Sequence, residues 1–285
     1  MECANYYREM ESVKCPLCGS DSATRVLNVS GPDPYLDLIG RKYEPLARFW
    51  VRCDRCGHLH NSVRLSGEEL ETLYDRFRDE AWRKESPDQY FDRITSLSPD
   101  QSENHQKVDL ILSLLDDRRA TDTGQLMIDI GCGGGVLIET FQRRLSDTWS
   151  FFGIEPTSSF AELAHRRTGA TVINANYQSS LFGETKFDLA TCCQVLEHLS
   201  DPGDFLTQIR MDLRDGASLY LEVPDESDFR SLPANHDRFM AQHVSYFGKA
   251  LLQRLLEDRG FSIEHSGVHR TVRGRNNLWF LASAA

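Results

Sequence analysis

The chain has 285 residues, enough for one large core and a smaller appended segment. Its formal net charge of -11 argues against broad binding of nucleic-acid phosphates, which requires clustered Lys and Arg. No run approaches the ~20 apolar residues of a membrane helix, and residues 1–14 lack the apolar stretch of a signal peptide. We therefore expect a cytoplasmic protein with neither a membrane nor a nucleic-acid partner.

The N-terminal region contains two C-x-x-C motifs, each followed by glycine. They are Cys15-Pro16-Leu17-Cys18-Gly19 and Cys53-Asp54-Arg55-Cys56-Gly57. Two such turns supply four thiolates for tetrahedral zinc, which leaves no open position for a substrate. We predict a structural Zn²⁺ bound by the following residues: Cys15, Cys18, Cys53 and Cys56.

The residues between the two motifs must form an excursion, which we expect as a loop over Gly31–Tyr43. His58 and His60 are possible replacements for a thiolate but are not needed, and Cys3 has no partner. The stretch Arg41–Arg64 is locally basic, with six Arg or Lys against two acidic residues. It has two interpretations: a solvated face, or a docking surface for an anionic substrate such as a diphosphate or carboxylate.

Residues 65–119 have the pattern of a helical segment. Ser66 and Glu69 have the spacing of a capping box, and apolar residues follow at helical intervals. The aromatic residues of the segment are core residues or a partial roof over an active site; they are Tyr74, Trp82, Tyr90 and Phe91.

From residue 120 onward, predicted strands alternate with helices. We expect strands at Leu126–Ile130, Ser150–Ile154, Thr171–Ile173, Phe187–Cys193, Ser218–Val223, Phe261–His269 and Asn277–Ala282. The intervening helices are expected at Val136–Arg144, Phe160–Arg167, Pro202–Leu213 and Leu251–Arg259. Such alternation predicts an α/β fold with a mostly parallel sheet covered on both faces. The organisation is thus a zinc ribbon (1–64), a helical linker or lid (65–119) and a Rossmann-like domain (120–285).

The segment Asp129–Gly135 is a glycine-rich turn between a strand and a helix. Glycine allows the sharp turn and a close approach of the backbone to a ligand. Glu155 ends the next strand, 24 residues after Gly131, where a carboxylate accepts hydrogen bonds from ribose hydroxyls. This pair indicates an adenosine-type ligand, either a dinucleotide or S-adenosylmethionine.

The stretch Lys186–Pro202, which includes Leu196-Glu197-His198-Leu199, closely resembles that of class I S-adenosylmethionine-dependent methyltransferases. So does Asp129–Gly135, and the resemblance extends over about 125–282. It implies a Rossmann-like, seven-stranded methyltransferase sheet and S-adenosylmethionine as cofactor. The same resemblance favours a structural over a catalytic role for His198, at a helix start.

The resemblance also implies cofactor roles by position. Gly131, Gly133 and Gly135 would border the methionine and ribose, and Asp129 would order the loop or bind the ammonium group. Glu155 would hold the ribose, and Pro156 would shape the adenine edge. Asn176 would stand where the family usually has an acidic adenine contact, and Gln194 would lie near the transferred methyl.

The acceptor site is expected after the fifth strand of this domain, where ligands bind in such sheets. His243-Val244-Ser245-Tyr246-Phe247 resembles a segment widespread in this methyltransferase group. We predict His243 as general base or substrate contact, with His236 and Tyr246 behind it. An alternative is that His243 only ties the loop to the core.

The combination of ribbon, helices and methyltransferase domain resembles bacterial enzymes that methylate sugars or secondary metabolites. Our first hypothesis is O-methylation of a small, sugar-containing or anionic metabolite, with His-assisted deprotonation. The alternatives are C-methylation of a nucleotide-linked keto sugar and a non-catalytic, cofactor-sensing zinc-ribbon module. An NAD-dependent dehydrogenase is disfavoured by Gln194–Pro202. The sequence indicates neither the acceptor nor the oligomeric state.

Overall fold

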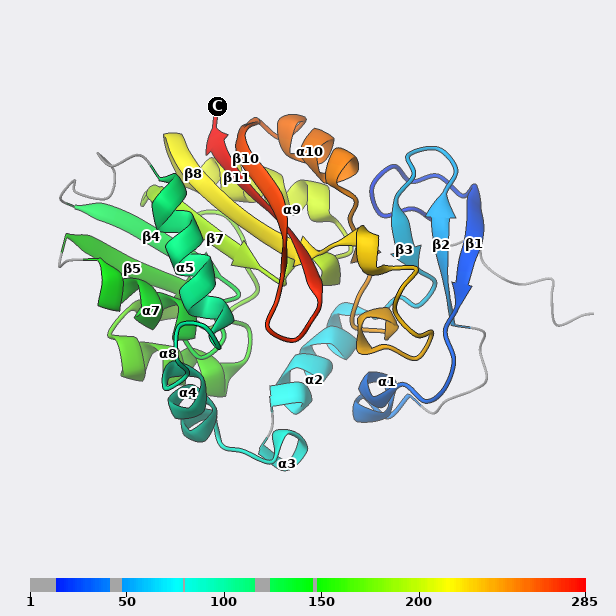
Figure 1. Cartoon of the computed structure of the whole chain (residues 1–285), viewed down its shortest axis with the longest axis horizontal. Helices are drawn as coiled ribbons and strands as arrows, with labels where there is room; N and C mark the ends of the chain where they lie inside the picture. Colours follow the sequence, from blue (N-terminus) through cyan, green and yellow to red (C-terminus); the bar gives the residue numbers. More distant parts are fainter. Residues whose placement is uncertain (1–13, 42–47, 79, 116–123, 146–147) are drawn as a thin grey trace, which may run out of the picture.

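The computed structural model describes residues 14–41, 48–78, 80–115, 124–145 and 148–285. Two sheets lie next to each other, a seven-stranded one and a four-stranded one on the right of Figure 1. Cys3, residues 42–47 and residues 116–119, which the sequence analysis mentions, lie outside the described residues. Within the described residues, no helix is long and apolar enough to cross a membrane.

The larger sheet has the strand order β10-β11-β8-β7-β4-β5-β6. Its strands are β4 (Gln125–Ile130), β5 (Trp149–Ile154), β6 (Thr171–Ile173), β7 (Phe187–Cys193), β8 (Leu213–Pro224), β10 (Phe261–Arg270) and β11 (Asn276–Ala284). The pairs among β4 to β8 are parallel, whereas β11 is antiparallel to both β8 and β10. The predicted α/β class and the mostly parallel sheet of seven strands are confirmed.

Helices cover both faces of this sheet, as Figure 1 shows. On one face, α9 (Pro202–Asp212) and α10 (Lys249–Glu257) pack against the sheet through leucine, isoleucine and phenylalanine side chains. On the other face lie α5 (Glu103–Leu114), α7 (Val136–Arg144) and α8 (Ser158–Thr168). Because both faces are buried, the central strands are almost continuously apolar.

The four-stranded sheet has the order β1-β2-β3-β9. It consists of β1 (Ala23–Asn28), β2 (Phe49–Cys53), β3 (Leu59–Asn61) and β9 (Ser245–Tyr246). The last strand comes from the C-terminal region and pairs antiparallel with β3. The N-terminal ribbon is therefore joined by backbone hydrogen bonds to the segment just after His243. The predicted domain boundary near residue 64 stays a prediction.

The sequence analysis expected the excursion between the cysteine motifs to be a loop, but it also contains regular structure. It includes β1 and a short helix, α1 (Pro34–Leu38), which lies within the expected loop. Asp33 caps α1 by accepting hydrogen bonds from the backbone N–H groups of Tyr35 and Leu36. Proline at the first helical position fits the start of a helix, because it has no N–H to leave unpaired.

The predicted helical segment contains α2 (Gly67–Arg78), α3 (Glu80–Arg83), α4 (Pro87–Thr95) and α5. Ser66 and Glu69 form the expected capping box, in which each side chain accepts a hydrogen bond from the other's backbone N–H. The segment crosses from the ribbon, where α2 contacts α1, to the larger sheet, where α4 contacts α7 and α8.

We predict that Asp33→Ala lowers the free energy of unfolding by about 3–5 kcal/mol, the cost of breaking a buried ion pair. The buried Asp33 carboxylate binds the buried Arg48 guanidinium at 2.8 Å and the backbone N–H of Ala241 at 2.9 Å. Urea denaturation of this variant and of Asp37→Ala, an exposed carboxylate of α1, measures the effect. Equal losses in the two variants would contradict the prediction.

Candidate functional site

The glycine loop follows β4 and requires glycine for steric reasons. Gly131 has a φ of +77°, and a Cβ there would lie 2.5 Å from Cγ2 of Val195. Gly135 also has a positive φ, of +83°, and a Cβ there would lie 3.0 Å from Ala164 of α8. Glycine at 131 therefore lets the loop pack against Val195, whereas Gly135 lets α7 and α8 pack together.

Glu155 stands at the end of β5 and is almost fully buried. Its carboxylate accepts hydrogen bonds from the backbone N–H of Gly133 and of Thr157, both at 3.0 Å. The side chain thus fixes the glycine loop to the end of the neighbouring strand. The sequence analysis predicted a ribose contact for Glu155 but did not anticipate this second task.

Two adjoining cavities open at the carboxyl ends of the parallel strands. The larger, of about 610 Å³, is lined by these predicted residues: Gly131, Glu155, Pro156, Asn176, Gln194 and His243. The smaller, of about 380 Å³, is lined by Asp129, Gly131, Gly133 and Gln194. The structure thus brings together every predicted cofactor residue except Gly135, which supports the loop from behind.

A buried polar network lies beneath the smaller cavity. Asp129 accepts a hydrogen bond from the Thr191 hydroxyl at 2.6 Å, and burial raises the pKa of its carboxyl to about 6. Lys107 of α5 forms a buried ion pair with Glu222 at 3.0 Å, and Gln194 donates its backbone N–H to the carbonyl of Glu222. The sequence analysis did not identify Lys107. The sequence feature that could have indicated it is a lysine next to Val108, among the apolar residues that form the buried face of the helix.

Two histidines line the larger cavity, His198 just after β7 and His243 just before β9. His198 Nδ1 lies 2.7 Å from the carbonyl oxygen of Gln242, and His243 Nδ1 lies 2.8 Å from that of Arg238. A carbonyl only accepts, so each Nδ1 bears the proton and each Nε2 is an acceptor. Burial lowers the pKa of His198 to about 4 and that of His243 well below its usual range. Both rings are therefore neutral at neutral pH.

Glu197 lies beside these histidines, and its carboxylate has no hydrogen-bond partner among the described residues. Its exposed fraction is 0%, and neither oxygen accepts a hydrogen bond from a described residue. Burial raises the pKa of Glu197 to about 8. The sequence analysis quoted this residue only as part of a motif. No local pattern marks a glutamate as unpaired, because that depends on the tertiary environment.

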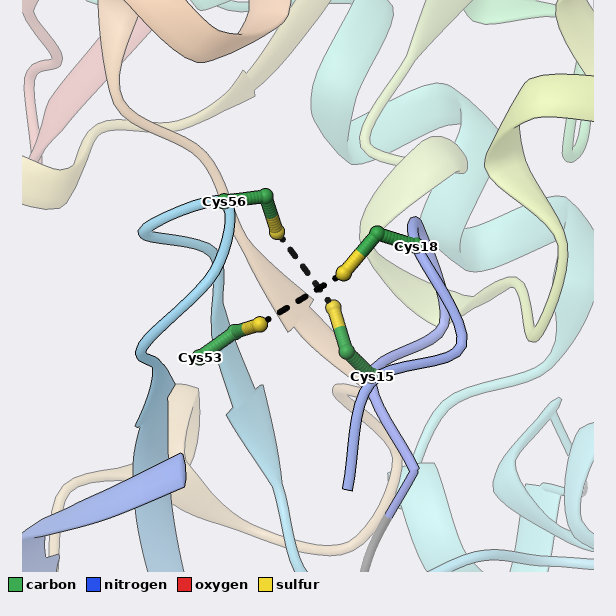
Figure 2. Close-up of side chains that lie close together, drawn as sticks. All are labelled: Cys15, Cys18, Cys53 and Cys56. Carbon is green, nitrogen blue, oxygen red and sulfur yellow. Dashed lines mark hydrogen bonds between the residues drawn. The ribbon is translucent and has the colours of Figure 1, made fainter. Parts of the chain in front are cut away.

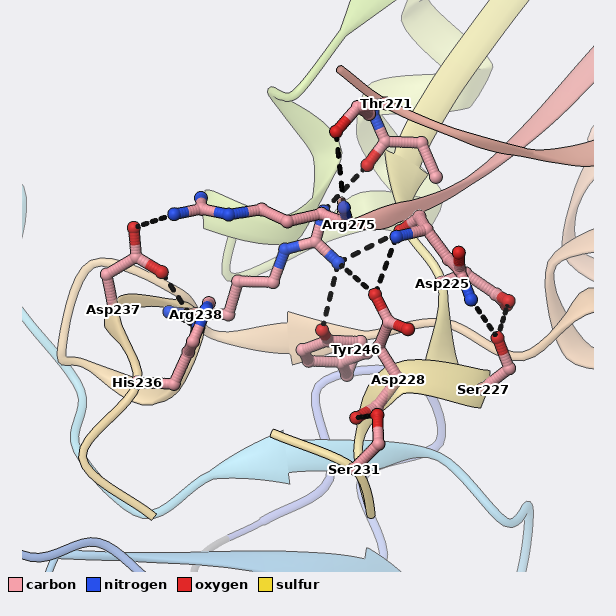
Figure 3. A network of polar contacts seen from close by, with 12 residues as sticks. Asp225, Ser227, Asp228, Ser231, His236, Asp237, Arg238, Tyr246, Thr271 and Arg275 are labelled. Atoms are coloured by element: carbon pink, nitrogen blue, oxygen red, sulfur yellow. Dashed lines mark hydrogen bonds and ion pairs between the residues drawn. The ribbon is translucent and has the colours of Figure 1, made fainter. Parts of the chain in front are cut away.

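The other two predicted catalytic residues do not line either cavity. Figure 3 shows them in the network around Arg238. His236 Nδ1 accepts from the backbone N–H of Arg238, and the Tyr246 hydroxyl contacts the Arg238 guanidinium at 3.4 Å. Tyr246 is fully buried among Trp50, Phe229 and Phe239, so it belongs to the core beneath the ribbon.

Arg238 itself is held by several acceptors. Its guanidinium donates to Asp228 at 3.2 Å, to the side chain of Asn277 at 2.7 Å and to the backbone carbonyl of Asn276 at 2.9 Å. This network fixes the backbone carbonyl of Arg238, which in turn orients the His243 ring. His236 and Tyr246 thus lie behind His243, and the structure gives them no direct access to an acceptor.

Helix α2 forms one wall of the larger cavity. Tyr74 lines it and meets the His198 ring edge-on at 6.4 Å, whereas Phe91 is a core residue and Trp82 is 39% exposed. Arg78 and Arg83 also line this cavity, and neither has a carboxylate partner among the described residues. Of the four predicted roof aromatics, Tyr74 therefore lines the larger cavity and Tyr90 lines the smaller one.

The basic stretch Arg41–Arg64 does not supply the cavity with positive charge. Arg48 is paired with Asp33, Arg52 with Glu226 at 2.6 Å, and Arg41 with Glu69 at 3.6 Å. Arg64 donates to His60 Nδ1 at 3.0 Å. Within the described part of this stretch, the arginines thus serve mainly internal contacts, and the positive charge at the cavity comes from α2, α3 and the β10–β11 turn.

The four predicted zinc ligands meet at one point, as Figure 2 shows. The Sγ atoms of Cys15 and Cys56 lie 3.5 Å apart, as do those of Cys18 and Cys53, and all four lie within 4.8 Å of one another. Tetrahedral zinc with Zn–S bonds of ~2.3 Å requires S···S separations of about 3.8 Å, so the donor set fits Zn²⁺.

The two nearby histidines are not part of this sulfur cluster. His58 Nε2 lies 3.0 Å from the Ser245 hydroxyl, and His60 is bonded to Arg64. Both rings are buried, and burial lowers the pKa of His60 to about 4. The prediction that four cysteines suffice as ligands agrees with this arrangement.

Comparisons with known proteins agree with the architecture. A family model described as a methyltransferase domain matches residues 82–266. A ubiquinone biosynthesis O-methyltransferase of Hahella chejuensis is 28% identical over 47% of this chain and 56% of its own length. An uncharacterised transposon protein of Streptomyces fradiae is 27% identical over 72% of this chain and 57% of its own. The chain thus spans little more than half the length of these curated relatives.

Among solved structures, magnesium protoporphyrin IX methyltransferase from Synechocystis, with bound S-adenosylmethionine, has a TM-score of 0.55. It is 19% identical and covers 78% of this chain and 99% of its own. At this identity, the likeness concerns the fold.

Proposed function

This chain belongs to the methyltransferase domain family and has the class I fold of S-adenosylmethionine-dependent enzymes, and we infer from this that it is a methyltransferase. We propose that S-adenosylmethionine spans the two adjoining cavities. The adenosine would lie by Glu155, Pro156 and Asn176, at the end of β5. The methionine part would extend past Gly131 and Gln194 toward Asp129. Gln194 borders both cavities, which supports placing the transferred methyl group there.

We further propose O-methylation of a small acceptor bound in the larger cavity. The main supporting observation is the pair of neutral imidazoles, each with Nε2 available as an acceptor. When bound, S-adenosylmethionine would supply a methyl group on a sulfonium, whose sulfur would keep the C–S electron pair as the acceptor oxygen bonds to the methyl carbon. The hydroxyl proton passes to His243 Nε2, and the enzyme's main contribution is alignment of the reactants.

The acceptor class follows from the lining of the cavity. Tyr74 and Phe77 offer flat apolar surfaces, whereas Arg78 and Arg83 offer positive charge. These groups suit a small metabolite with a ring and an anionic substituent, including a sugar-containing one. The test is a panel of small ring-containing acceptors with an anionic substituent, including sugars. For any acceptor that supports turnover, NMR of the product distinguishes an O-methyl from a C-methyl group.

The sulfur cluster supports a structural role for zinc in our proposal. Four thiolates fill the tetrahedral coordination sphere, so the metal has no position for a substrate. When bound, Zn²⁺ crosslinks the two turns of the ribbon. The ribbon then supports β3, which pairs with β9 directly after His243.

We predict that His243→Gln lowers kcat by a factor of about 10²–10⁴, the usual contribution of a general base. S-adenosylmethionine affinity should stay within a few-fold, because His243 lies on the acceptor side of the cavity. S-adenosylhomocysteine release measures turnover, and isothermal titration measures affinity. His236→Gln is the matched control, since His236 lies outside the cavity, and it should change kcat only a few-fold. Equal kcat losses in the two variants would contradict the assignment.

A further inference from the structure

Three possible metal ligands converge at the acceptor end of the larger cavity. They are Glu197, His198 and His243, and one ligand atom from each lies within 4.8 Å of the other two. Glu197 Oε1 and His198 Nε2 are 4.0 Å apart, and the two imidazole centroids are 4.8 Å apart. His198 and His243 come from segments 44 residues apart in sequence, and the fold brings them together.

Both imidazoles have the tautomer that metal ligation requires. The Nδ1–H of each ring donates to a backbone carbonyl, at 2.7 Å for His198 and 2.8 Å for His243. Histidines that bind metals typically donate their second ring nitrogen in this way, which fixes the ring and leaves the other nitrogen as ligand. The Arg238 network holds the carbonyl that orients His243, so this ring is already positioned.

Glu197 gives independent evidence for a missing positive partner. Both carboxylate oxygens are buried, and neither accepts a hydrogen bond from a described residue. A buried carboxylate without a partner is costly in either protonation state, because its polar atoms have lost water and gained nothing. The Arg238 charge is already neutralised by Asp228 and does not bond to Glu197. A cation between the three side chains would satisfy both the carboxylate and the free Nε2 atoms.

We propose that Glu197, His198 and His243 form a binding site for one divalent first-row transition cation, such as Mn²⁺, Co²⁺ or Zn²⁺. Two imidazoles and one carboxylate are the ligand set of such ions, whereas Mg²⁺ and Ca²⁺ prefer oxygen donors alone. Three protein ligands leave positions open toward the cavity. This site is separate from the four cysteines, whose donors are all sulfur.

This inference rests on the proposed O-methylation and changes one part of it, the group that takes the hydroxyl proton. An oxygen that coordinates the cation loses its proton more readily, and the proton then leaves to water. His243 would then act as a ligand, which excludes its simultaneous action as the general base. The two roles are distinguished by whether methyl transfer needs the cation.

The test is an Mn²⁺ titration of the full-length chain with its ribbon zinc-loaded, followed by electron paramagnetic resonance of free Mn²⁺. Mn²⁺ prefers nitrogen and oxygen donors to thiolates, so the ribbon does not compete for it. We expect one saturable Mn²⁺ site per chain. Glu197→Gln and His198→Gln should each weaken Mn²⁺ binding at least ~10-fold. Even the loss of a residue that only hydrogen-bonds to a metal ligand typically weakens binding by that much. His165→Gln, on the exposed side of α8, should leave it unchanged.

Circular dichroism and S-adenosylmethionine binding verify the folding of each variant, and the use of two variants protects the test against one that misfolds. Absence of saturable binding of Mn²⁺, Co²⁺ and Zn²⁺ beyond the ribbon zinc would overturn the inference. So would equal affinity in wild type and both folded variants. Methyl transfer that persists in the folded Glu197→Gln and His198→Gln variants without cation binding would leave the proposed function intact. Cation binding without methyl transfer to any acceptor would support the cation site and contradict the proposed O-methylation.

Discussion

Replacing Glu155 by alanine is expected to raise the Kd for S-adenosylmethionine by about two orders of magnitude. The carboxylate accepts two backbone hydrogen bonds, from Gly133 and Thr157, that fix the glycine loop. Hydrogen bonds to a charged group contribute roughly 1.5–3 kcal/mol each. A combined loss of about 3 kcal/mol corresponds to somewhat more than 100-fold in affinity. In our proposal the ribose contacts are lost as well.

Isothermal titration with S-adenosylmethionine and S-adenosylhomocysteine measures this effect. Glu162→Ala is the matched control, because Glu162 is an exposed carboxylate on the adjacent helix α8. Glu155→Gln should have an intermediate affinity, since an amide oxygen still accepts from one N–H but has no charge. Unchanged affinity in the alanine variant would exclude Glu155 from the cofactor site and would also show that the loop does not depend on it.

The second large effect is expected for Cys15→Ser, which should remove one equivalent of bound zinc per chain, the zinc of the ribbon. Structural zinc sites contribute about 10–16 kcal/mol of apparent binding free energy in small zinc-dependent folds. The ribbon has a small core around Trp50 and Leu59, so loss of the metal should unfold β1 to β3 locally. Because β3 pairs with β9, two residues after His243, we expect methyl transfer to fall as well.

Elemental analysis by mass spectrometry measures zinc per chain, and hydrogen exchange localises the unfolding to β1–β3. Cys192→Ser is the control, because Cys192 is a buried thiol of the larger sheet, away from the sulfur cluster. It should retain as much zinc per chain as the wild type. Full zinc occupancy in the Cys15 variant, with unchanged exchange in the ribbon, would argue against a four-cysteine site.

The strands and helices of the larger sheet were predictable because local patterns determine them. Phe187–Cys193 is an apolar run and is β7 with the same bounds, and Val136–Arg144 is α7 as expected. The excursion between the cysteine motifs was less predictable, since α1 depends on Asp33. That side chain caps the helix and also binds Arg48 and Ala241, which are distant in sequence.

The candidate site divides in the same way. The glycine loop and Glu155 are recognisable from spacing, because the turn after one strand and the tip of the next meet at the same edge of a parallel sheet. Among the acceptor-side histidines, His243 and His236 were equally visible in the sequence. Only the fold distinguishes their positions. His243 lines the cavity, whereas His236 does not, and its Nδ1 lies 2.8 Å from Oδ1 of Asp237.

The sequence by itself determined the fold class, the glycine loop and the pairing of the four cysteines, because each depends on short-range spacing of residues with special chemistry. The tertiary structure decided the rest. It placed Lys107 against Glu222 and joined the ribbon to the segment after His243 through β9. It also left the Glu197 carboxylate without a hydrogen-bond partner in the described part of the chain. Burial and pairing over long sequence distances set the charge and hydrogen bonding of these groups, and no local pattern contains that information.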